Sequence, residues 1–317
     1  MSYVGGIRAE VLYSQAGAAK RTARLRTSII GRKMNTAVLL LSTPGPFARK
    51  GVVADISKFL VAHHGSVLHS DDHLDSSRDI FLSRLEWDLS EFDIPVSEFE
   101  QHFKPLAERF QIHYHLALTA YRPRIAILVS AYDHCLADLL YRQNAGELQC
   151  DIVRIISNHS TARRLAEFYH APYHLLTNPT DKRASEQEML ELLGQNVDLI
   201  VLARYMQILG PEFVAQYLLR MINIHHSFLP AFVGAKPYHQ AFGRGVKLIG
   251  ATSHYVTADL DEGPIIEQDV VRVTHRDTVE EMLAKGRDLE KVVLSRAVRW
   301  HLENRVLVYQ NKTVVFV

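Results

Sequence analysis

Three polar side chains in the second half of the sequence are of the types that move acyl groups. Asn223 and His225 lie two positions apart at the end of an apolar run, and Asp261 follows in the turn-like segment Asp-Leu-Asp-Glu-Gly-Pro. An amide and an imidazole can donate hydrogen bonds to a developing oxyanion, and a carboxylate can manage protons. These three residues are therefore candidates for a catalytic site.

The apolar run Met221–Ile224 is predicted to form a β-strand. Because side chains alternate across a strand, Asn223 and His225 should share one face, with His226 on the other. Ligands of open α/β sheets gather at the carboxyl ends of the strands, where both residues would lie. An isolated Asn-x-His could equally satisfy backbone groups at a strand end, and Asp261 alone could be an ordinary turn residue. The spacing by itself leaves both interpretations open.

The segment around these residues resembles the signature of the folate-dependent formyltransferases. The shared motifs are Asn223-Ile224-His225, Ser227-Phe228-Leu229-Pro230, Gly234, Gln240-Ala241, His254 and Leu260-Asp261-Glu262-Gly263-Pro264. Within that family, the chain from about Met34 to Val317 looks most like the formyltetrahydrofolate deformylases. The resemblance implies hydrolysis of 10-formyltetrahydrofolate to formate and tetrahydrofolate, a reaction of one-carbon and purine metabolism that needs no cofactor.

The resemblance also implies a role for each site residue. Asn223 and His225 would hold the oxyanion. Asp261 would orient or deprotonate the attacking water, with His254 supporting it. The folate substrate would contact a set of residues on two loops: Met206, Gln207, Ile208, Leu209, Asp259 and Leu260. No metal is predicted, because His225 and His226 point to opposite faces and the chain has no metalloprotease-type histidine pair.

The predicted turn after the strand Ile125–Ser130 bears on the identity of the formyl acceptor. In the glycinamide ribonucleotide formyltransferases, a glycine-rich loop here cradles the substrate phosphate at a helix N-terminus. In this chain the turn reads Ser130-Ala131-Tyr132-Asp133, without glycine, and both Tyr132 and Asp133 oppose a phosphate. Water is therefore the predicted acceptor. Formyl transfer to an amine and a non-catalytic amino-acid sensor are the alternatives.

The fold class is predicted to be α/β with two domains. Residues 34–121 show the order β-α-β-β-α-β of a ferredoxin-like α+β unit and resemble an ACT regulatory domain. Residues 122–317 alternate apolar strands with helices, which indicates a Rossmann-like, mostly parallel sheet in a formyltransferase-like catalytic domain. The resemblance places an amino-acid effector, glycine or methionine, at the loop that contains Pro44, Gly45, Arg49 and Gly51. A sharp turn before a helix is the alternative.

The later part of the second domain shows three further patterns. Strands near Lys247–Val256 and Pro264–Val273 are predicted to pair antiparallel at one edge of the sheet. A long helix follows from about Thr278, and Asp277-Thr278-Val279-Glu280 resembles a capping box at its start. The segment Arg305–Val317 is predicted to close the domain as a hairpin.

The bulk composition limits the partners. The chain has 36 basic and 35 acidic residues, so it lacks the long-range field that nucleic-acid or membrane binding would require. No apolar run approaches the roughly 18 residues that span a bilayer. Cys135 and Cys150 form no Cys-x-x-Cys pair, which favours free thiols in a reducing, cytoplasmic compartment. The ACT resemblance implies a homo-oligomer.

Residues 1–33 differ in composition from the rest of the chain. They carry seven basic residues and a single acidic one, Glu10, and resemble an organelle transit peptide. A translation start at Met34 is the alternative that we favour. In either case, little order is expected in this segment.

Overall fold

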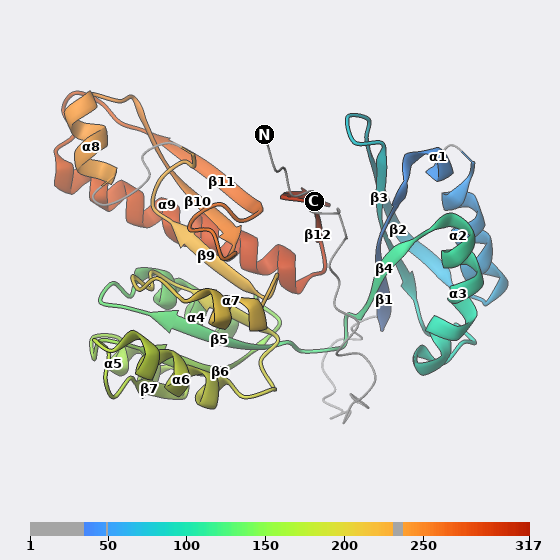
Figure 1. Cartoon of the computed structure of the whole chain (residues 1–317), viewed down its shortest axis with the longest axis horizontal. Coiled ribbons are helices and arrows are strands. Elements are labelled where there is room, and N and C mark those ends of the chain that lie inside the picture. The colour runs from blue at the N-terminus through green and yellow to red at the C-terminus, as the bar shows by residue number, and fades with distance from the viewer. Residues whose placement is uncertain (1–34, 49, 231–236) are drawn as a thin grey trace, which may run out of the picture. The chain divides into compact units, whose positions relative to one another are not determined.

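The computed structural model describes residues 35–48, 50–230 and 237–317. The described chain forms two compact units (Figure 1). One contains the described residues up to Tyr121 together with Glu303–Val317, and the other is Arg122–Leu302. The composition-based prediction for residues 1–33 lies outside the described residues. Among the described helices, none has the length and apolar character that crossing a membrane demands.

The N-terminal unit is built on a four-stranded antiparallel sheet. Its strands are β1 (Thr36–Pro44), β2 (Ser66–Asp75), β3 (Ile80–Asp88) and β4 (His113–Leu118), in the spatial order β2-β3-β1-β4. Its helical segments are α1 (Gly45–Ala48), α2 (Val52–Ala62), the short 3₁₀ turn η2 (Val96–Glu98) and α3 (Phe99–Phe110). The unit also includes the C-terminal hairpin of β12 (Val306–Tyr309) and β13 (Lys312–Val315). The order of elements confirms the predicted ferredoxin-like arrangement.

The two faces of this sheet are covered by different segments. Leu39 lies in a core with residues of α2 and α3, whereas its neighbours Val38 and Leu40 pack with Leu307 and Phe316 of the hairpin region. The sequence pattern predicted that this hairpin belongs to the second domain. In the structure it belongs to the N-terminal unit instead. The physical reason is that β1 is apolar on both faces, so its second face must also be buried.

The second unit contains a seven-stranded sheet covered by helices. Its strands are β5 (Arg124–Val129), β6 (Asp151–Ser157), β7 (Tyr173–Leu175), β8 (Leu199–Leu202), β9 (Met221–His225), β10 (Leu248–Tyr255) and β11 (Ile265–Arg272), in the order β11-β10-β9-β8-β5-β6-β7. The strands from β9 to β7 in that order run parallel, and β10 and β11 are antiparallel at one edge. Both features confirm the predicted topology (Figure 1).

The helices of this unit are α4 (His134–Asn144), α5 (Arg163–Phe168), α6 (Lys182–Leu193), α7 (Pro211–Gln216), α8 (Pro237–Arg244) and α9 (Val279–Leu302). Their alternation with the parallel strands and the long helix α9 were predicted, whereas α8 was not. Helix α9 packs along β9, β10 and β11 and against α4. It begins with a capping box, in which the Thr278 N–H donates to the Glu281 carboxylate at 2.7 Å and the Glu281 N–H donates to the Thr278 hydroxyl at 3.2 Å. The predicted box had included Glu280, and the carboxylate three positions after the cap is Glu281 instead.

The predicted effector loop follows β1 in the N-terminal unit. Pro44 ends that strand, and the Gly45 N–H donates to the Asp79 carbonyl at 2.7 Å, with no room for a Cβ beside the Asp79 side chain. Gly51 caps α2 with a φ of 84°, a conformation that favours glycine. Arg49 lies outside the described residues. Both glycines thus have backbone roles, and effector binding at this loop stays a prediction.

Candidate active site

Three of the candidate residues are held by two adjacent strands of the second sheet, β9 and β10. The antiparallel register places Asn223 of β9 opposite His254 of β10, and His225 opposite Thr252. The parallel register on the other side pairs Asn223 with Leu202 of β8. The sheet therefore fixes the backbones of Asn223, His225 and His254 near the carboxyl end of β9, where the sequence pattern predicted the site.

Asp261 approaches the same strand end, although it lies in a loop. Its Oδ2 is 3.1 Å from His225 Nδ1, and its Oδ1 is 3.6 Å from His254 Nε2. The Asn223 Nδ2 is 3.3 Å from the same His254 Nε2. The structure thus brings together all four residues that were predicted to form or support the reaction centre.

The loop between β10 and β11 is shaped to present Asp261. The Tyr255 N–H donates to the Pro264 carbonyl at 2.9 Å and closes the base of the loop. Gly263 lies so close to the Tyr255 carbonyl that a Cβ there would overlap it. Asp261 itself has a φ of 59°, a left-handed conformation that aspartate and asparagine tolerate better than most residues. These constraints direct the carboxylate toward His225.

The charge state of the centre follows from these contacts. Burial raises the pKa of the Asp261 carboxyl, but its contacts with the imidazoles of His225 and His254 outweigh burial and hold that pKa well below its usual range. Asp261 is therefore a carboxylate at neutral pH. His225 Nδ1 faces this carboxylate, while His225 Nε2 is buried and has no hydrogen-bond partner among the described residues.

His254 links the amide to the carboxylate. Its Nδ1 donates to the Tyr255 carbonyl at 2.9 Å, so in the neutral ring Nε2 is an acceptor. The Asn223 amide can then donate to Nε2, which fixes the orientation of Asn223. The gap of 3.6 Å between His254 Nε2 and Asp261 Oδ1 is longer than a direct hydrogen bond.

Comparisons with known proteins agree with this geometry. The profile of the formyl transferase family matches residues 123–298. The formyltetrahydrofolate deformylase of Synechocystis sp. is 51% identical over 283 residues, which are 89% of this chain and 98% of that protein. The crystal structure of a formyltetrahydrofolate deformylase from Pseudomonas syringae superposes with a TM-score of 0.86 at 48% identity, covering 90% of this chain and 96% of that one. This chain belongs to the formyltetrahydrofolate deformylase family.

The deformylase family also shares part of its fold with transferases. The crystal structure of a glycinamide ribonucleotide transformylase from Symbiobacterium toebii superposes with a TM-score of 0.59 at 29% identity. It covers 64% of this chain and 98% of that one. The similarity to the deformylases therefore extends over a larger part of the chain than the similarity to this transferase.

The residues predicted to bind folate lie on two loops of this deformylase-family chain. Met206 and Ile208, beyond β8, are 52% and 60% exposed, and Leu260, beside Asp261, is 59% exposed. Large apolar side chains with such exposure are candidates for contact with an aromatic ligand. Gln207 and Asp259 are also exposed, and Leu209 is half-buried. Their folate contacts stay a prediction.

A buried polar cluster behind the centre was not predicted. Glu290 of α9 is 1% exposed, and its carboxylate lies 2.8 Å from His134 Nε2, 2.9 Å from the Tyr238 hydroxyl and 3.4 Å from Arg204 Nε. Burial raises the pKa of the Glu290 carboxyl, and the His134 and Arg204 contacts outweigh it and lower the pKa. The sequence signal that could have revealed Glu290 is its spacing on α9. Glu290 lies three and four residues before the buried Val293 and Leu294, which places it on the same buried face of the helix.

The same cluster has the spacing of a metal site within the part of the chain that the structure describes. Ligand atoms of His134, Cys135 and Glu290 lie within 4.8 Å of one another. Burial raises the pKa of the Cys135 thiol well above its usual value, and the Arg204 cation beside Glu290 opposes a second positive charge. These residues do not fit a metal ion well, and the prediction of no metal stays a prediction.

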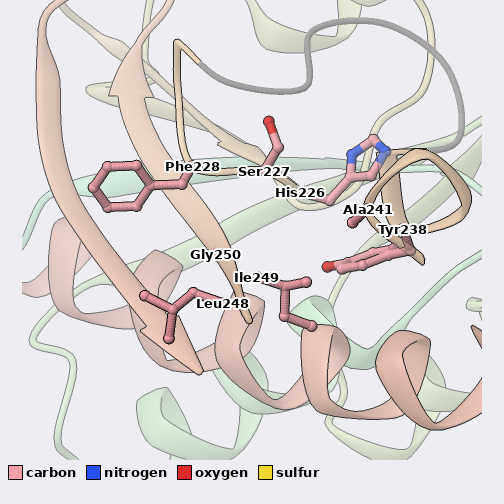
Figure 2. A pocket seen from close by; sticks show the side chains of 8 residues that line it. All are labelled: His226, Ser227, Phe228, Tyr238, Ala241, Leu248, Ile249 and Gly250. Atoms are coloured by element: carbon pink, nitrogen blue, oxygen red, sulfur yellow. The ribbon is translucent and has the colours of Figure 1, made fainter. Parts of the chain in front are cut away.

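A small pocket lies on the His226 side of β9 (Figure 2). His226 and Tyr238 project toward it from different segments, and their rings are 6.1 Å apart. Its lining is otherwise mostly small or apolar and consists of Ser227, Phe228, Ala241, Leu248, Ile249 and Gly250. Asn223, His225 and Asp261 are not part of this pocket, so it is distinct from the proposed reaction centre.

Proposed function

We propose that this chain hydrolyses 10-formyltetrahydrofolate to formate and tetrahydrofolate. The observation that carries the proposal is the Asp261 carboxylate, held 3.1 Å from His225 beside Asn223 in a member of the deformylase family. The chain is accordingly a hydrolase that acts on a carbon–nitrogen bond. No cofactor enters the scheme, because the formylated folate is the substrate.

Asn223 and His225 stabilise the oxyanion in this proposal. Attack of water on the formyl carbon forms a tetrahedral intermediate with negative charge on the former carbonyl oxygen. The buried His225 Nε2 makes no hydrogen bond within the described chain, so an incoming oxygen could satisfy it. When protonated on both nitrogens, His225 donates to Asp261 through Nδ1 and to the oxyanion through Nε2. Each such donor contributes roughly 3–4 kcal/mol to transition-state stabilisation.

Asp261 manages the protons of the reaction. Its carboxylate accepts a hydrogen bond from the attacking water and takes a proton as the carbon–oxygen bond forms. The proton then passes to the folate nitrogen as the carbon–nitrogen bond breaks, which leaves formate and tetrahydrofolate. Because the pKa of the Asp261 carboxyl is lowered, it holds the proton only transiently and mainly orients the water.

We also propose that the ferredoxin-like unit regulates hydrolysis by binding an amino acid, with glycine and methionine as the candidates. The four-stranded sheet with helices and the turn between Pro44 and Gly51 support an ACT-type role. Unregulated hydrolysis would deplete the one-carbon groups carried by folate. A regulatory domain that limits the rate would prevent this loss. A cytoplasmic homo-oligomer is the corresponding proposal for assembly and location.

The test is an absorbance and formate assay of the purified full chain with 10-formyltetrahydrofolate and no amine. Formate and tetrahydrofolate should appear in equal amounts, and added glycine or methionine should change the rate. Tetrahydrofolate that appears only after an amine is supplied, together with a formylated amine, would favour transfer instead. A folded chain that is inactive under both conditions would favour a non-catalytic sensor.

A further inference from the structure

The segment that follows β8 is held at its start by one buried serine. Ser130 comes directly after β5 and is 2% exposed. Its backbone N–H donates to the Arg204 carbonyl at 3.3 Å, and its hydroxyl oxygen accepts from the Met206 N–H at 3.0 Å. Ser130 therefore bridges the residues on both sides of Tyr205. Arg204 has a φ of 62°, which is uncommon for a residue other than glycine, so the chain changes direction at this point.

A carboxylate on α6 holds the end of the same segment. Glu186 Oε1 accepts from the Gly210 N–H at 2.7 Å, and the Glu186 side chain is only 19% exposed. A Cβ on Gly210 would lie 2.9 Å from the other carboxylate oxygen, so glycine permits this close approach. A hydrogen bond to a charged acceptor is stronger than one between neutral groups. Glu186 thus fixes the backbone immediately before Pro211 begins α7.

The residues predicted to bind folate after β8 lie between these two hydrogen bonds. Residues 206–209 are called the folate loop here. Met206, Gln207 and Ile208 are exposed, and Leu209 packs against the core cluster that contains Tyr205. Within the described part of the chain, residues 207–209 make no hydrogen bond. The shape of the exposed part of the loop therefore depends on the contacts at its two ends.

Such contacts affect ligand binding by ordering the loop in advance. A loop that must become ordered on binding reduces the affinity, and contacts that order it beforehand remove this cost. The apparent Kd rises as the fraction of molecules with a binding-competent loop falls. Ser130 and Glu186 belong to different elements and hold opposite ends of the loop, so the loss of either contact releases a different end.

We propose that Ser130 and Glu186 are positioning residues for the folate substrate. Each fixes one end of the folate loop and raises the affinity for folate through the loop, not through the reaction centre. The inference rests on the proposed function, because it takes a folate as the ligand of the loop. Ser130 also opens the glycine-free turn after β5, so this turn contributes to binding of the folate.

The test measures binding of tetrahydrofolate, the proposed product, to the purified full chain and its variants by calorimetry under anaerobic conditions. Ser130→Ala removes the hydroxyl that accepts from the Met206 N–H. Ser157→Ala is the matched control. Ser157 ends the neighbouring strand β6, is also buried, and its hydroxyl forms hydrogen bonds of 2.8 and 3.1 Å with the backbone of His159, outside the folate loop.

A second pair of variants tests the other end of the loop. Glu186→Leu removes the acceptor for the Gly210 N–H, whereas Glu186→Gln retains an oxygen that can accept from it. Glu188→Leu is the matched control, because Glu188 lies on the same helix and its side chain is 22% exposed. Glu188 also accepts from a backbone N–H, that of Thr177 at 3.0 Å, in a loop with no predicted folate contact.

Ser130→Ala and Glu186→Leu should each raise the Kd for tetrahydrofolate about five- to tenfold, as expected for the loss of one hydrogen bond. Glu186→Gln and both controls should keep the wild-type Kd. In the formate assay, the two affected variants should show a higher KM and a nearly unchanged kcat, because the substrate and the transition state use the loop equally. A purely structural role would lower Tm and leave Kd unchanged.

The binding result can be read even if the wild type releases no formate, so the proposed function and this inference fail separately. A folded Ser130→Ala variant with the Kd of Ser157→Ala would refute the role of Ser130. Equal Kd values for folded Glu186→Leu and Glu188→Leu would do the same for Glu186. A wild-type chain that binds no tetrahydrofolate would also overturn the inference.

Hydrogen exchange gives a readout that needs no variant. In the wild type without ligand, the hydrogen-bonded Met206 and Gly210 amides should exchange about tenfold or more slowly than those of Gln207 and Ile208. Tetrahydrofolate should then slow exchange at Gln207 and Ile208. Exchange at Met206 and Gly210 that is as fast as in the middle of the loop would contradict the anchoring at both ends.

Discussion

Replacement of Asp261 by asparagine removes the charge of the reaction centre while preserving its shape. Asparagine tolerates the left-handed φ of 59° that this position requires. Its Oδ1 can accept from His225 Nδ1, which lies 3.1 Å from Asp261 Oδ2. Its Nδ2 would face His254 Nε2, which lies 3.6 Å from Oδ1 in the wild type. The perturbation is therefore largely confined to the charge and the basicity of one side chain.

The expected cost to catalysis is much larger than the cost to stability. Loss of a positioned proton-transfer group lowers kcat by about 10²–10⁴, which corresponds to about 3–5 kcal/mol in the barrier. Loss of one charge-assisted contact should lower the free energy of unfolding by about 1–2 kcal/mol. For a unit of this size, Tm should then fall by only a few degrees, on the order of 2–4 °C for each kcal/mol.

The assay compares formate release by the wild type and Asp261→Asn at saturating 10-formyltetrahydrofolate, with Tm measured on the same samples. Asp288→Asn controls for the loss of one negative charge, because the Asp288 side chain pairs with Lys291 on the surface of α9. A folded Asp261→Asn variant that retains wild-type kcat would remove Asp261 from the mechanism. A variant that has lost its fold would show that Asp261 acts mainly through stability.

Two further predictions concern pH and loop shape. Burial lowers the pKa of His226 to about 4, so between about pH 6.5 and 4 the unfolded chain binds a proton that the folded chain does not. Stability should therefore fall by about 3 kcal/mol as the pH drops through this window. The free energy of unfolding of His226→Phe, measured in urea, should depend less steeply on pH than that of the wild type. An unchanged pH dependence would contradict the assignment. Gly263→Ala places a Cβ against the Tyr255 carbonyl and should lower kcat about 100-fold by displacing the loop. Gly243→Ala, which meets no atom within 4 Å, is its control, and equal activity of the two variants would refute the argument.

Much of the fold and the reaction centre could be predicted because their signals are local. The apolar strand Met221–His225 places two functional side chains by alternation alone. Asp261 was found through its motif, and the turn chemistry of Gly263 agrees with the close approach to Tyr255. Local sequence patterns are sufficient where one strand or one turn determines the position of a side chain.

The missed features depend on contacts between distant segments. Glu290 occupies a core position of α9, but nothing in its neighbourhood reveals that His134 lies 2.8 Å away across 156 positions. The hairpin of β12 and β13 was assigned to the second domain by proximity in sequence, whereas Leu307 packs with Val38 of the first strand. Helix α8 follows a segment outside the described residues and is too short for a strong periodic pattern.

The choice between hydrolysis and transfer does not reside in the three central residues. Asn223, His225 and Asp261 stabilise the same tetrahedral intermediate whether the nucleophile is water or an amine. A transferase must also bind its second substrate, and that requires an open site with groups that complement the acceptor. In this chain the turn before α4 has no glycine and instead carries Tyr132, which is 56% exposed, and Asp133, the residue that precedes the helix. Specificity for water can therefore arise from the lack of a phosphate-binding turn, without any change in the three central residues.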